Sequence, residues 1–368
     1  MLEEKEISNQ SLDNGAEQSF GKGVETSKKK KKIITYLSFI LVNVIVILLL
    51  LFFEDRSGDK VAGREAFSLL GKNWGYTALS ILMFFIIIIG DTIVFYTLTK
   101  KMNIEKNLSL SLKTSILGRY YDRLTPWAMG GEPFQVAYLI SGGVKAGDSF
   151  AITMSRHIIR FFSVAIAVIT ILIASRITTN IYVMVVAILS VFGGLIFPSF
   201  MLLCCFRPRI GFKIGRGIIK LLYKIKLVKN YDKLVEKMER EVANFIRGLE
   251  YLSANKKVII IITLVSLIEL FATNSVPFFV IKALGISNIF YWKTLVLCIF
   301  VNYASSFAPT PGGSGIAELS FYAIFASFIT GSYLFWAVLF WRIAVFYIPV
   351  FIGFVTQFAE AIKKIRKA

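Results

Sequence analysis

Ala308-Pro309-Thr310-Pro311-Gly312-Gly313-Ser314-Gly315-Ile316-Ala317-Glu318 separates two apolar runs, Thr294–Phe307 and Leu319–Ile329. Its two prolines and three glycines cannot continue a helix, because proline lacks the N–H and glycine gives up too much backbone freedom. Broken backbone persists at membrane depth only where it is buried in protein or lines a wet cavity. Each run is also shorter than the roughly 20 residues of a normal span. The stretch therefore predicts two half-helices that meet at a buried tip. The alternative is an ordinary Pro-Gly loop between short spans.

The composition is that of a membrane protein. Hydrophobic residues make up 56% of the 368 residues and several runs exceed 18 apolar residues, which predicts an all-α polytopic membrane protein. The net charge of +19 comes from bases in loops beside the apolar runs, so we interpret it as contact with anionic inner-leaflet lipids, with no nucleic acid as partner. The three cysteines have neither disulfide nor metal-ligand spacing, and no metal or cofactor is expected.

About six full spans are predicted, within one transmembrane domain of residues 33–358. Residues 1–32 end in five lysines and are expected to be a disordered basic cytoplasmic tail. The basic tail 359–368 is expected to be cytoplasmic as well. The segment 207–257 holds 14 Lys and Arg against 5 Asp and Glu, so we predict cytoplasmic helices that lie on the inner leaflet. Their predicted apolar face comprises Ile218, Ile219, Leu221, Leu222 and Ile225. The predicted spans are Ile33–Phe53, Trp74–Thr99, Ser149–Ile173, Ile181–Phe206, Val258–Leu284 and Tyr333–Phe358.

Topological parity decides how the segment 113–140 is placed. It contains Gly118-Arg119-Tyr120-Tyr121-Asp122-Arg123-Leu124-Thr125-Pro126-Trp127-Ala128-Met129-Gly130-Gly131-Glu132-Pro133, whose charges, prolines and glycines make a poor simple span. If it crossed the membrane once, the basic segment 207–257 would lie outside, so we predict a re-entrant hairpin that enters from the cytoplasm. The same test, applied to the basic C-terminus, makes 294–329 a second re-entrant hairpin of opposite orientation.

The two hairpins predict an inverted repeat, about 74–173 and about 258–358. Thr125-Pro126 matches Thr310-Pro311 at an offset of 185, while Glu132 matches Glu318 and Arg156 matches Arg342 at an offset of 186. Inverted repeats with broken helices at corresponding positions point to a substrate site near the bilayer midplane.

These motifs also carry a family resemblance. From about Ile33 to its end, the chain resembles the transmembrane flippase part of the lysylphosphatidylglycerol synthase/flippase family, through Gly118–Pro126 with Gly130–Pro133 and Pro309–Gly315 with Glu318. The resemblance implies a membrane domain that moves aminoacylated phospholipid from the inner to the outer leaflet. Bifunctional members add a C-terminal cytoplasmic aminoacyltransferase. This sequence ends directly after its last predicted span, so we expect a stand-alone member without that domain.

A phospholipid headgroup needs cations for its phosphate and, where it is aminoacylated, carboxylates for its ammonium groups. Arginine suits phosphate because its planar fork can donate two parallel hydrogen bonds. The candidate substrate-binding residues are Arg119, Asp122, Arg123, Glu132, Arg156, Arg160, Glu269, Glu318 and Arg342. The candidate hairpin and gate residues are Thr125, Pro126, Gly130, Gly131, Thr310, Pro311, Gly312, Gly313 and Gly315. The alternative is that these charges only pair with one another to hold the hairpins.

Some single residues carry their own expectations. Asp91 lies inside a span and is either functional or a packed, hydrogen-bonded carboxylate. Asp122 is expected to orient the neighbouring arginines, and His157, the sole histidine, to be a helix-face or interface residue. Gly130-Gly131 is expected to correspond to Gly312-Gly313 in the second repeat.

Enzyme functions are not indicated, since the sequence has no P-loop and no Ser-His-Asp or Cys-His set can be assembled around its one histidine. We predict a multi-pass protein of the cytoplasmic membrane that translocates a phospholipid, either aminoacylated phosphatidylglycerol or another polar or anionic lipid. A separate lipid synthase and a second copy of the chain are further candidate partners. Two alternatives stay open: a secondary transporter of a small anionic solute, and a non-transporting subunit that docks a lipid-modifying enzyme on 207–257.

Overall fold

The structure is a computed structural model that describes residues 63–104, 108–175, 181–225, 230–305, 308–329 and 331–367. All of them belong to one unit of the chain, Leu51–Ala368. The predicted tail 1–32 and the predicted first span Ile33–Phe53 lie outside the described residues. Within the described ranges all regular secondary structure is helical, as the composition predicts.

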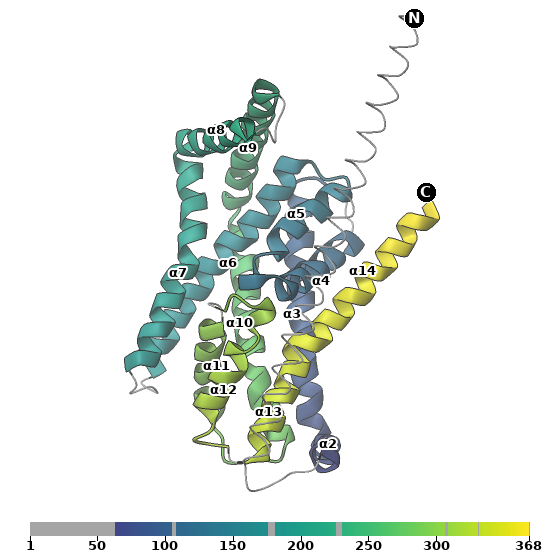
Figure 1. Cartoon of the computed structure of the whole chain (residues 1–368), viewed down its shortest axis with the longest axis vertical. Coiled ribbons are helices and arrows are strands. Elements are labelled where there is room, and N and C mark those ends of the chain that lie inside the picture. The colour runs from purple at the N-terminus through teal and green to yellow at the C-terminus, as the bar shows by residue number, and fades with distance from the viewer. Residues whose placement is uncertain are drawn as a thin grey trace, which may run out of the picture. The chain divides into compact units, whose positions relative to one another are not determined.

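The helices follow one another with short connections (Figure 1). In chain order they are α2 (Gly63–Lys72), α3 (Trp74–Lys101), α4 (Leu108–Leu124), the 3₁₀ turn η1 (Pro126–Ala128), α5 (Gly131–Ser141), α6 (Ala146–Ser175), α7 (Ile181–Phe206), α8 (Pro208–Lys224), α9 (Tyr231–Ser253), α10 (Lys256–Ala283), α11 (Tyr291–Ser305), the 3₁₀ turn η2 (Pro311–Gly313), α12 (Ile316–Phe325), α13 (Ser332–Arg342), the π-helical segment η3 (Ile343–Tyr347) and α14 (Ile348–Lys367).

Four helical segments of the described ranges are long and apolar enough to cross a membrane. They are Trp74–Lys101, Ala146–Ile171, Lys256–Ala283 and Ser332–Lys363. A fifth candidate is the pair α7 and α8, which is bent by 105° at its junction. The last of the four is predicted from the sequence as a simple span. It is not a uniform α-helix, because η3 interrupts it directly after Arg342.

One order of elements occurs twice: a long helix, a shorter helix, a break, another short helix and a final helix. The start of α10 lies 182 positions after that of α3, and the start of α11 lies 183 after that of α4. The corresponding offsets are 185 for α12 against α5 and 186 for α13 against α6. Residues 74–175 and 256–342 therefore share one order of helices at a nearly constant offset, which is the order that the predicted repeat requires.

The two breaks share a backbone conformation. Thr125 (φ −108°, ψ 146°) and Thr310 (φ −96°, ψ 150°) are extended, and each precedes a proline. The residue that follows the proline is left-handed in both breaks, with φ 54° and ψ 15° at Trp127 and φ 61° and ψ 20° at Gly312. Ala128 (φ 51°) and Gly313 (φ 67°) continue the match.

This geometry corrects the expected glycine correspondence. Trp127 and Ala128, not Gly130 and Gly131, occupy the positions equivalent to Gly312-Gly313. Gly130 is equivalent instead to Gly315, since each residue directly precedes the second half-helix of its repeat. Matching the repeats by their glycines gives the wrong correspondence. Trp127 and Ala128 adopt the left-handed conformation that a sequence pattern assigns to glycine.

The repeats pack against each other through α3 and α10, and the two breaks are in contact. Buried residues of α3 and α10, including Val94, Leu98 and Ile262, form part of one apolar cluster with Leu139 and Ile152 from the first repeat. In Figure 1, α4 and α5 occupy the half of the molecule that contains α9, while α11 and α12 occupy the other half. The breaks therefore meet between the two halves of the bundle.

The described part of the segment 207–257 forms the two helices α8 and α9, in agreement with its predicted helical structure. α8 carries an exposed apolar stripe beside a basic one, at the helical spacing of one face each. The apolar stripe comprises Ile214, Ile218, Leu221 and Ile225, and the basic one Lys213, Arg216, Lys220 and Lys224. Ile219 is predicted to lie on the same apolar face as Ile218. It is instead buried, where α8 packs on α9.

Candidate functional site

A cavity of about 460 Å³ lies where the two breaks meet, and its lining includes Trp127 and Ala128 of the first break and Gly312 and Gly313 of the second. Its walls differ in chemistry. The charged lining residues are Asp122, Arg123, Glu132, Arg160, Glu269 and Arg342. Neutral polar groups come from Ser266, Thr273, Asn274, Asn302, Tyr303 and Ser305. The apolar part includes Phe161, Val164, Val191, Leu270, Trp341 and Phe346.

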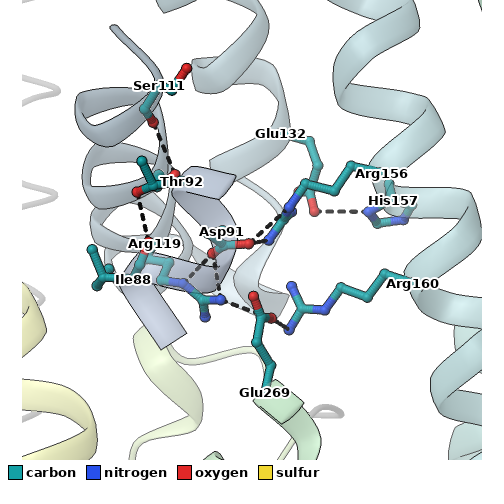
Figure 2. Close-up of polar contacts among 11 residues, drawn as sticks. Ile88, Asp91, Thr92, Ser111, Arg119, Glu132, Arg156, His157, Arg160 and Glu269 are labelled. Carbon is teal, nitrogen blue, oxygen red and sulfur yellow. Dashed lines mark hydrogen bonds and ion pairs between the residues drawn. The ribbon is translucent and has the colours of Figure 1, made fainter. Parts of the chain in front are cut away.

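Behind one wall, the buried Asp91 of α3 lies between two arginines (Figure 2). Nε and Nη2 of Arg119 (α4) both lie 2.5 Å from its Oδ2. Arg156 of α6, itself 4% exposed, contacts Oδ1 through Nη2 and through Nε at 2.9 Å. A carboxylate inside a membrane domain is stable only where it is paired, so Asp91 ties α3 to α4 and α6. This geometry is the packed carboxylate that the sequence allows as one alternative.

Glu269 of α10 extends this network into the cavity. Its Oε2 lies 2.9 Å from Nη2 of Arg119 and 3.5 Å from Nη2 of Arg160. The side chain of Arg160 is 35% exposed, and Figure 2 shows it reaching toward Glu269 from α6. The network of three arginines and two carboxylates carries one formal positive charge in excess. Arg160 is the most accessible arginine of this network and the only one of the three that lines the cavity.

The second break is held by a buried ion pair. Nε of Arg342 lies 2.5 Å from Oε1 of Glu318, while its other nitrogens donate to Oγ of Ser314 (3.0 Å) and to the carbonyl of Gly312 (3.3 Å). Oε2 of Glu318 accepts the backbone N–H of Gly315 at 2.7 Å, which caps the start of α12. The guanidinium also lies 4.7 Å from the ring of Phe346. Glu318 thus caps a helix and neutralises Arg342 at the same time.

The first break uses different chemistry. Oγ1 of Thr125 accepts the N–H of Gly130 at 2.8 Å, and Oδ1 of Asp122 accepts the N–H of Gly131 at 2.7 Å. Asp122 is expected from the sequence to orient the neighbouring arginines, but among the described residues it forms no ion pair with an arginine, and its hydrogen bond goes to the backbone. Its position beside Gly131 explains why: the carboxylate is held at the start of α5, where it satisfies an otherwise unpaired N–H.

Arg123 is held by backbone rather than by a carboxylate. Its Nε (3.0 Å) and Nη2 (2.8 Å) both donate to the carbonyl of Val345 in η3, and its Nη1 donates to the carbonyl of Arg119 at 3.1 Å. Arg123 and Val345 belong to different repeats, and both line the cavity. The bond therefore joins the repeats at the edge of the cavity.

Glu132 faces the cavity and pairs with the only histidine. Its Oε1 lies 2.9 Å from Nδ1 of His157, where α5 packs on α6. His157 is accordingly an interface residue, as expected from the sequence, although its partner could not be named from the sequence. The ring of Phe161 also contacts the imidazole in a tilted arrangement, with 4.5 Å between the ring centroids.

A neutral pair in the second repeat stands where the first repeat has a charged one. Asn274 lies 183 positions after Asp91, and Asn302 lies 183 positions after Arg119. Nδ2 of Asn302 donates to Oδ1 of Asn274 at 2.8 Å, so the two amides join α10 to α11 as the ion pair joins α3 to α4. Both asparagines line the cavity. The second repeat thus places a neutral amide pair on the cavity, whereas the corresponding charged pair of the first repeat lies behind the lining.

Comparison with known proteins adds the family. The family described as "Lysylphosphatidylglycerol synthase TM region" matches residues 37–353. The chain belongs to this family. A "UPF0104 membrane protein" from Archaeoglobus fulgidus is 28% identical to it over 223 residues, which is 60% of this chain and 66% of that protein. No solved structure matches the chain.

Within this member of the family, the sequence-predicted residues divide by position. Arg123, Asp122, Glu132, Arg160, Glu269 and Arg342 line the cavity, together with Gly312 and Gly313. Arg119, Arg156 and Glu318 lie behind it as ion-pair partners. Thr125, Pro126, Gly130, Gly131, Thr310, Pro311 and Gly315 shape the breaks without lining the cavity.

The alternative that the charges only pair with one another describes most of them but not Asp122 and Arg123, which are bonded to backbone groups. Sequence reasoning missed Asn302, Ser314 and the carbonyl of Val345. Asn302 was visible at the repeat offset from Arg119, whereas nothing in the sequence marks one carbonyl among many.

Proposed function

We propose that this family member moves a phospholipid between the leaflets of the cytoplasmic membrane. The observation that carries the proposal is the cavity at the meeting point of the two breaks, with arginines and carboxylates on one wall and apolar side chains on another. Its volume of about 460 Å³ falls in the usual range for a small-molecule site. It accommodates a headgroup, while the acyl chains stay in the lipid.

The arrangement of the breaks supports alternating access. We take α4–η1–α5 and α11–η2–α12 as re-entrant hairpins of opposite orientation, with both chain termini and the α8–α9 segment in the cytoplasm. Each hairpin then closes the cavity from one side of the membrane. Discontinuous helices at corresponding positions of two inverted repeats are the recurrent substrate site of secondary transporters, and a headgroup at their junction is reachable from either side in turn.

The charge pattern suits an anionic headgroup. Arg160 and Arg123 both line the cavity, and neither has a carboxylate to itself. Arg160 shares Glu269 with Arg119, and Arg123 donates to carbonyl groups. Glu132 gives a further acceptor for an ammonium group, which an aminoacylated lipid would use. We propose no catalytic centre in the chain: its role is to carry the lipid, alone or beside a separate synthase.

A leaflet assay tests the proposal. The purified chain is reconstituted into vesicles with a trace of acyl-labelled fluorescent phosphatidylglycerol, and dithionite then bleaches the label that is exposed outside. Vesicles with the chain are expected to lose inner-leaflet label faster than protein-free vesicles. Arg160→Gln should slow this loss. Lys113→Gln, which removes a cation paired with Glu360 at 2.7 Å and away from the cavity lining, should not.

The same preparation separates the alternatives. Uptake of a small anionic solute without lipid exchange would replace the proposal with a solute transporter. Co-purification of a lipid-modifying enzyme, with no lipid movement by the chain alone, would assign it a docking role. Mass spectrometry of the lipids retained on the purified protein names the substrate if the leaflet assay is positive.

A further inference from the structure

Arg123 is placed unlike the other arginines of the cavity. Arg160 and Arg342 each have a carboxylate within ion-pair distance, at 3.5 Å and 2.5 Å. Among the described residues none lies so close to Arg123, whose three nitrogens all donate to carbonyl oxygens. A guanidinium has five N–H groups, and the side chain is only partly buried where it lines the cavity. It is a cation whose present acceptors are all neutral.

Its main acceptor belongs to the other repeat. The carbonyl of Val345 lies in η3, where the backbone hydrogen-bond pattern departs from that of an α-helix. Two nitrogens of Arg123 share this one oxygen, at 3.0 Å and 2.8 Å. The next residue, Phe346, packs so closely on Gly312 that a Cβ at that glycine would overlap its ring. The bond from Arg123 therefore connects the first hairpin to the segment that supports the second break.

A phosphate is a better acceptor for this fork than a single carbonyl. Hydrogen bonds between a guanidinium and an ionised oxygen are roughly twice as strong as neutral ones, and two phosphate oxygens match the fork in parallel. Because Arg123 and Val345 both line the cavity, a phosphate that enters it competes for the same nitrogens. Capture of the guanidinium by the phosphate releases the carbonyl.

We propose that Arg123 is the residue that receives the phosphate of the transported molecule, and that this exchange of acceptors unlatches the first hairpin from η3. The inference rests on the proposed function for the identity of the ligand. In the empty protein the Arg123–Val345 bond holds the two repeats together, and in the loaded protein the headgroup replaces the carbonyl. Substrate itself is then the trigger for the change of access, so an empty carrier stays closed.

Binding to the full-length protein in detergent tests the first half of this statement. Three probes are compared: dihexanoylphosphatidylglycerol, glycerol 3-phosphate and dihexanoylglycerol, which lacks the phosphate. Arg123→Gln is expected to weaken binding of the phospholipid by about 10- to 100-fold, the range for hydrogen bonds to a charged group. Arg123→Lys should fall between, because it keeps the charge without the fork. Lys113→Gln, on the same helix, controls for loss of a positive charge.

Hydrogen exchange tests the second half. Amides of 343–348 should exchange faster when the phospholipid is added to the parental protein. In Arg123→Gln they should exchange faster from the start, with no further change on addition. Equal affinity in Arg123→Gln and the parental chain, binding of dihexanoylglycerol as tight as that of the phospholipid, or exchange that is unaltered by ligand would each overturn the inference.

The outcome is separable from that of the proposed function. Tight binding of glycerol 3-phosphate that depends on Arg123 would support the phosphate assignment and identify a soluble substrate. A chain that moves no lipid yet shows both Arg123-dependent results would contradict lipid translocation and leave Arg123 assigned. Lipid movement at an unchanged rate in Arg123→Gln would support lipid translocation and contradict the role assigned to Arg123.

Discussion

Ala128 and Gly313 occupy equivalent left-handed positions in the two breaks, at φ 51° and φ 67°, and exchanging their residue types should have opposite effects. A residue with a Cβ in this conformation costs roughly 1–2 kcal/mol. Ala128→Gly removes that cost, and the greater freedom of glycine in the unfolded chain returns roughly 0.5–1 kcal/mol of it. We therefore expect Ala128→Gly to leave the stability unchanged or raise it by up to about 1.5 kcal/mol.

Gly313→Ala should destabilise the protein. A Cβ at Gly313 would lie 3.0 Å from the carbonyl oxygen of Ser305, so the close approach of η2 to the end of α11 adds overpacking to the conformational cost. Overpacking in a well-packed region costs typically 1–3 kcal/mol. Gly313→Ala is expected to lower the stability by roughly 1–4 kcal/mol after the entropy gain is subtracted.

Thermal unfolding of the two variants in one detergent, followed by intrinsic fluorescence, measures the sign of each change, and the leaflet assay is run on the same samples. Ala128→Gly should retain translocation, because glycine holds the same backbone angles without strain. Equal midpoints for Gly313→Ala and the parental protein, or a loss in Ala128→Gly as large as in Gly313→Ala, would refute the assignment of the two positions as equivalent left-handed sites.

The remaining predictions concern the ion network, the first break and the surface of α8. Arg156→Ala leaves Asp91 with one buried partner and should cost about 3–5 kcal/mol of stability by thermal unfolding, with Arg156→Lys recovering part of it; no change in midpoint would contradict the network. Gly131→Ala should slow lipid exchange in the leaflet assay, since its Cβ would collide with the carboxylate of Asp122, and a parental rate would count against a gating role for the first break. A bimane label on the cysteine of Leu221→Cys should be quenched by brominated lipid more strongly in anionic than in neutral nanodiscs. The reason is that the exposed apolar stripe of α8 lies beside four basic residues. Absence of quenching would contradict contact between α8 and the leaflet.

The architecture was predictable from the sequence because its signals are local. Runs of apolar residues gave the bounds of α7, Ile181–Phe206, and came close to those of α3 and α10. Thr-Pro at a fixed offset located both breaks, since proline and an extended preceding residue act within a few positions. The π-helical η3 has no such local signal, because Ile343–Tyr347 are all compatible with an α-helix.

The partners of the charged residues could not be predicted in the same way. The sequence placed Arg119, Arg156 and Glu269 among the candidates, yet which arginine meets which carboxylate depends on how α3, α4, α6 and α10 cross. Asp122 illustrates the limit: it sits next to Arg123 in the sequence, and the helix directs its carboxylate to the N–H of Gly131 instead. Spacing along one helix predicts a shared face and says little about the element opposite that face.

The two repeats share a backbone conformation at their breaks and differ in the groups that hold the arginine at each break. At the first break an arginine is held by a carbonyl of the other repeat, whereas at the second the arginine is held within its own repeat by Glu318. Separating a buried ion pair is more costly than exchanging a neutral acceptor for a charged one. The Arg342–Glu318 pair therefore preserves the shape of the second break, while the bond from Arg123 can be traded for a ligand. In the proposed mechanism the two breaks are the alternative gates, and the difference between these two arginines lets a bound anion act first on the gate that holds Arg123.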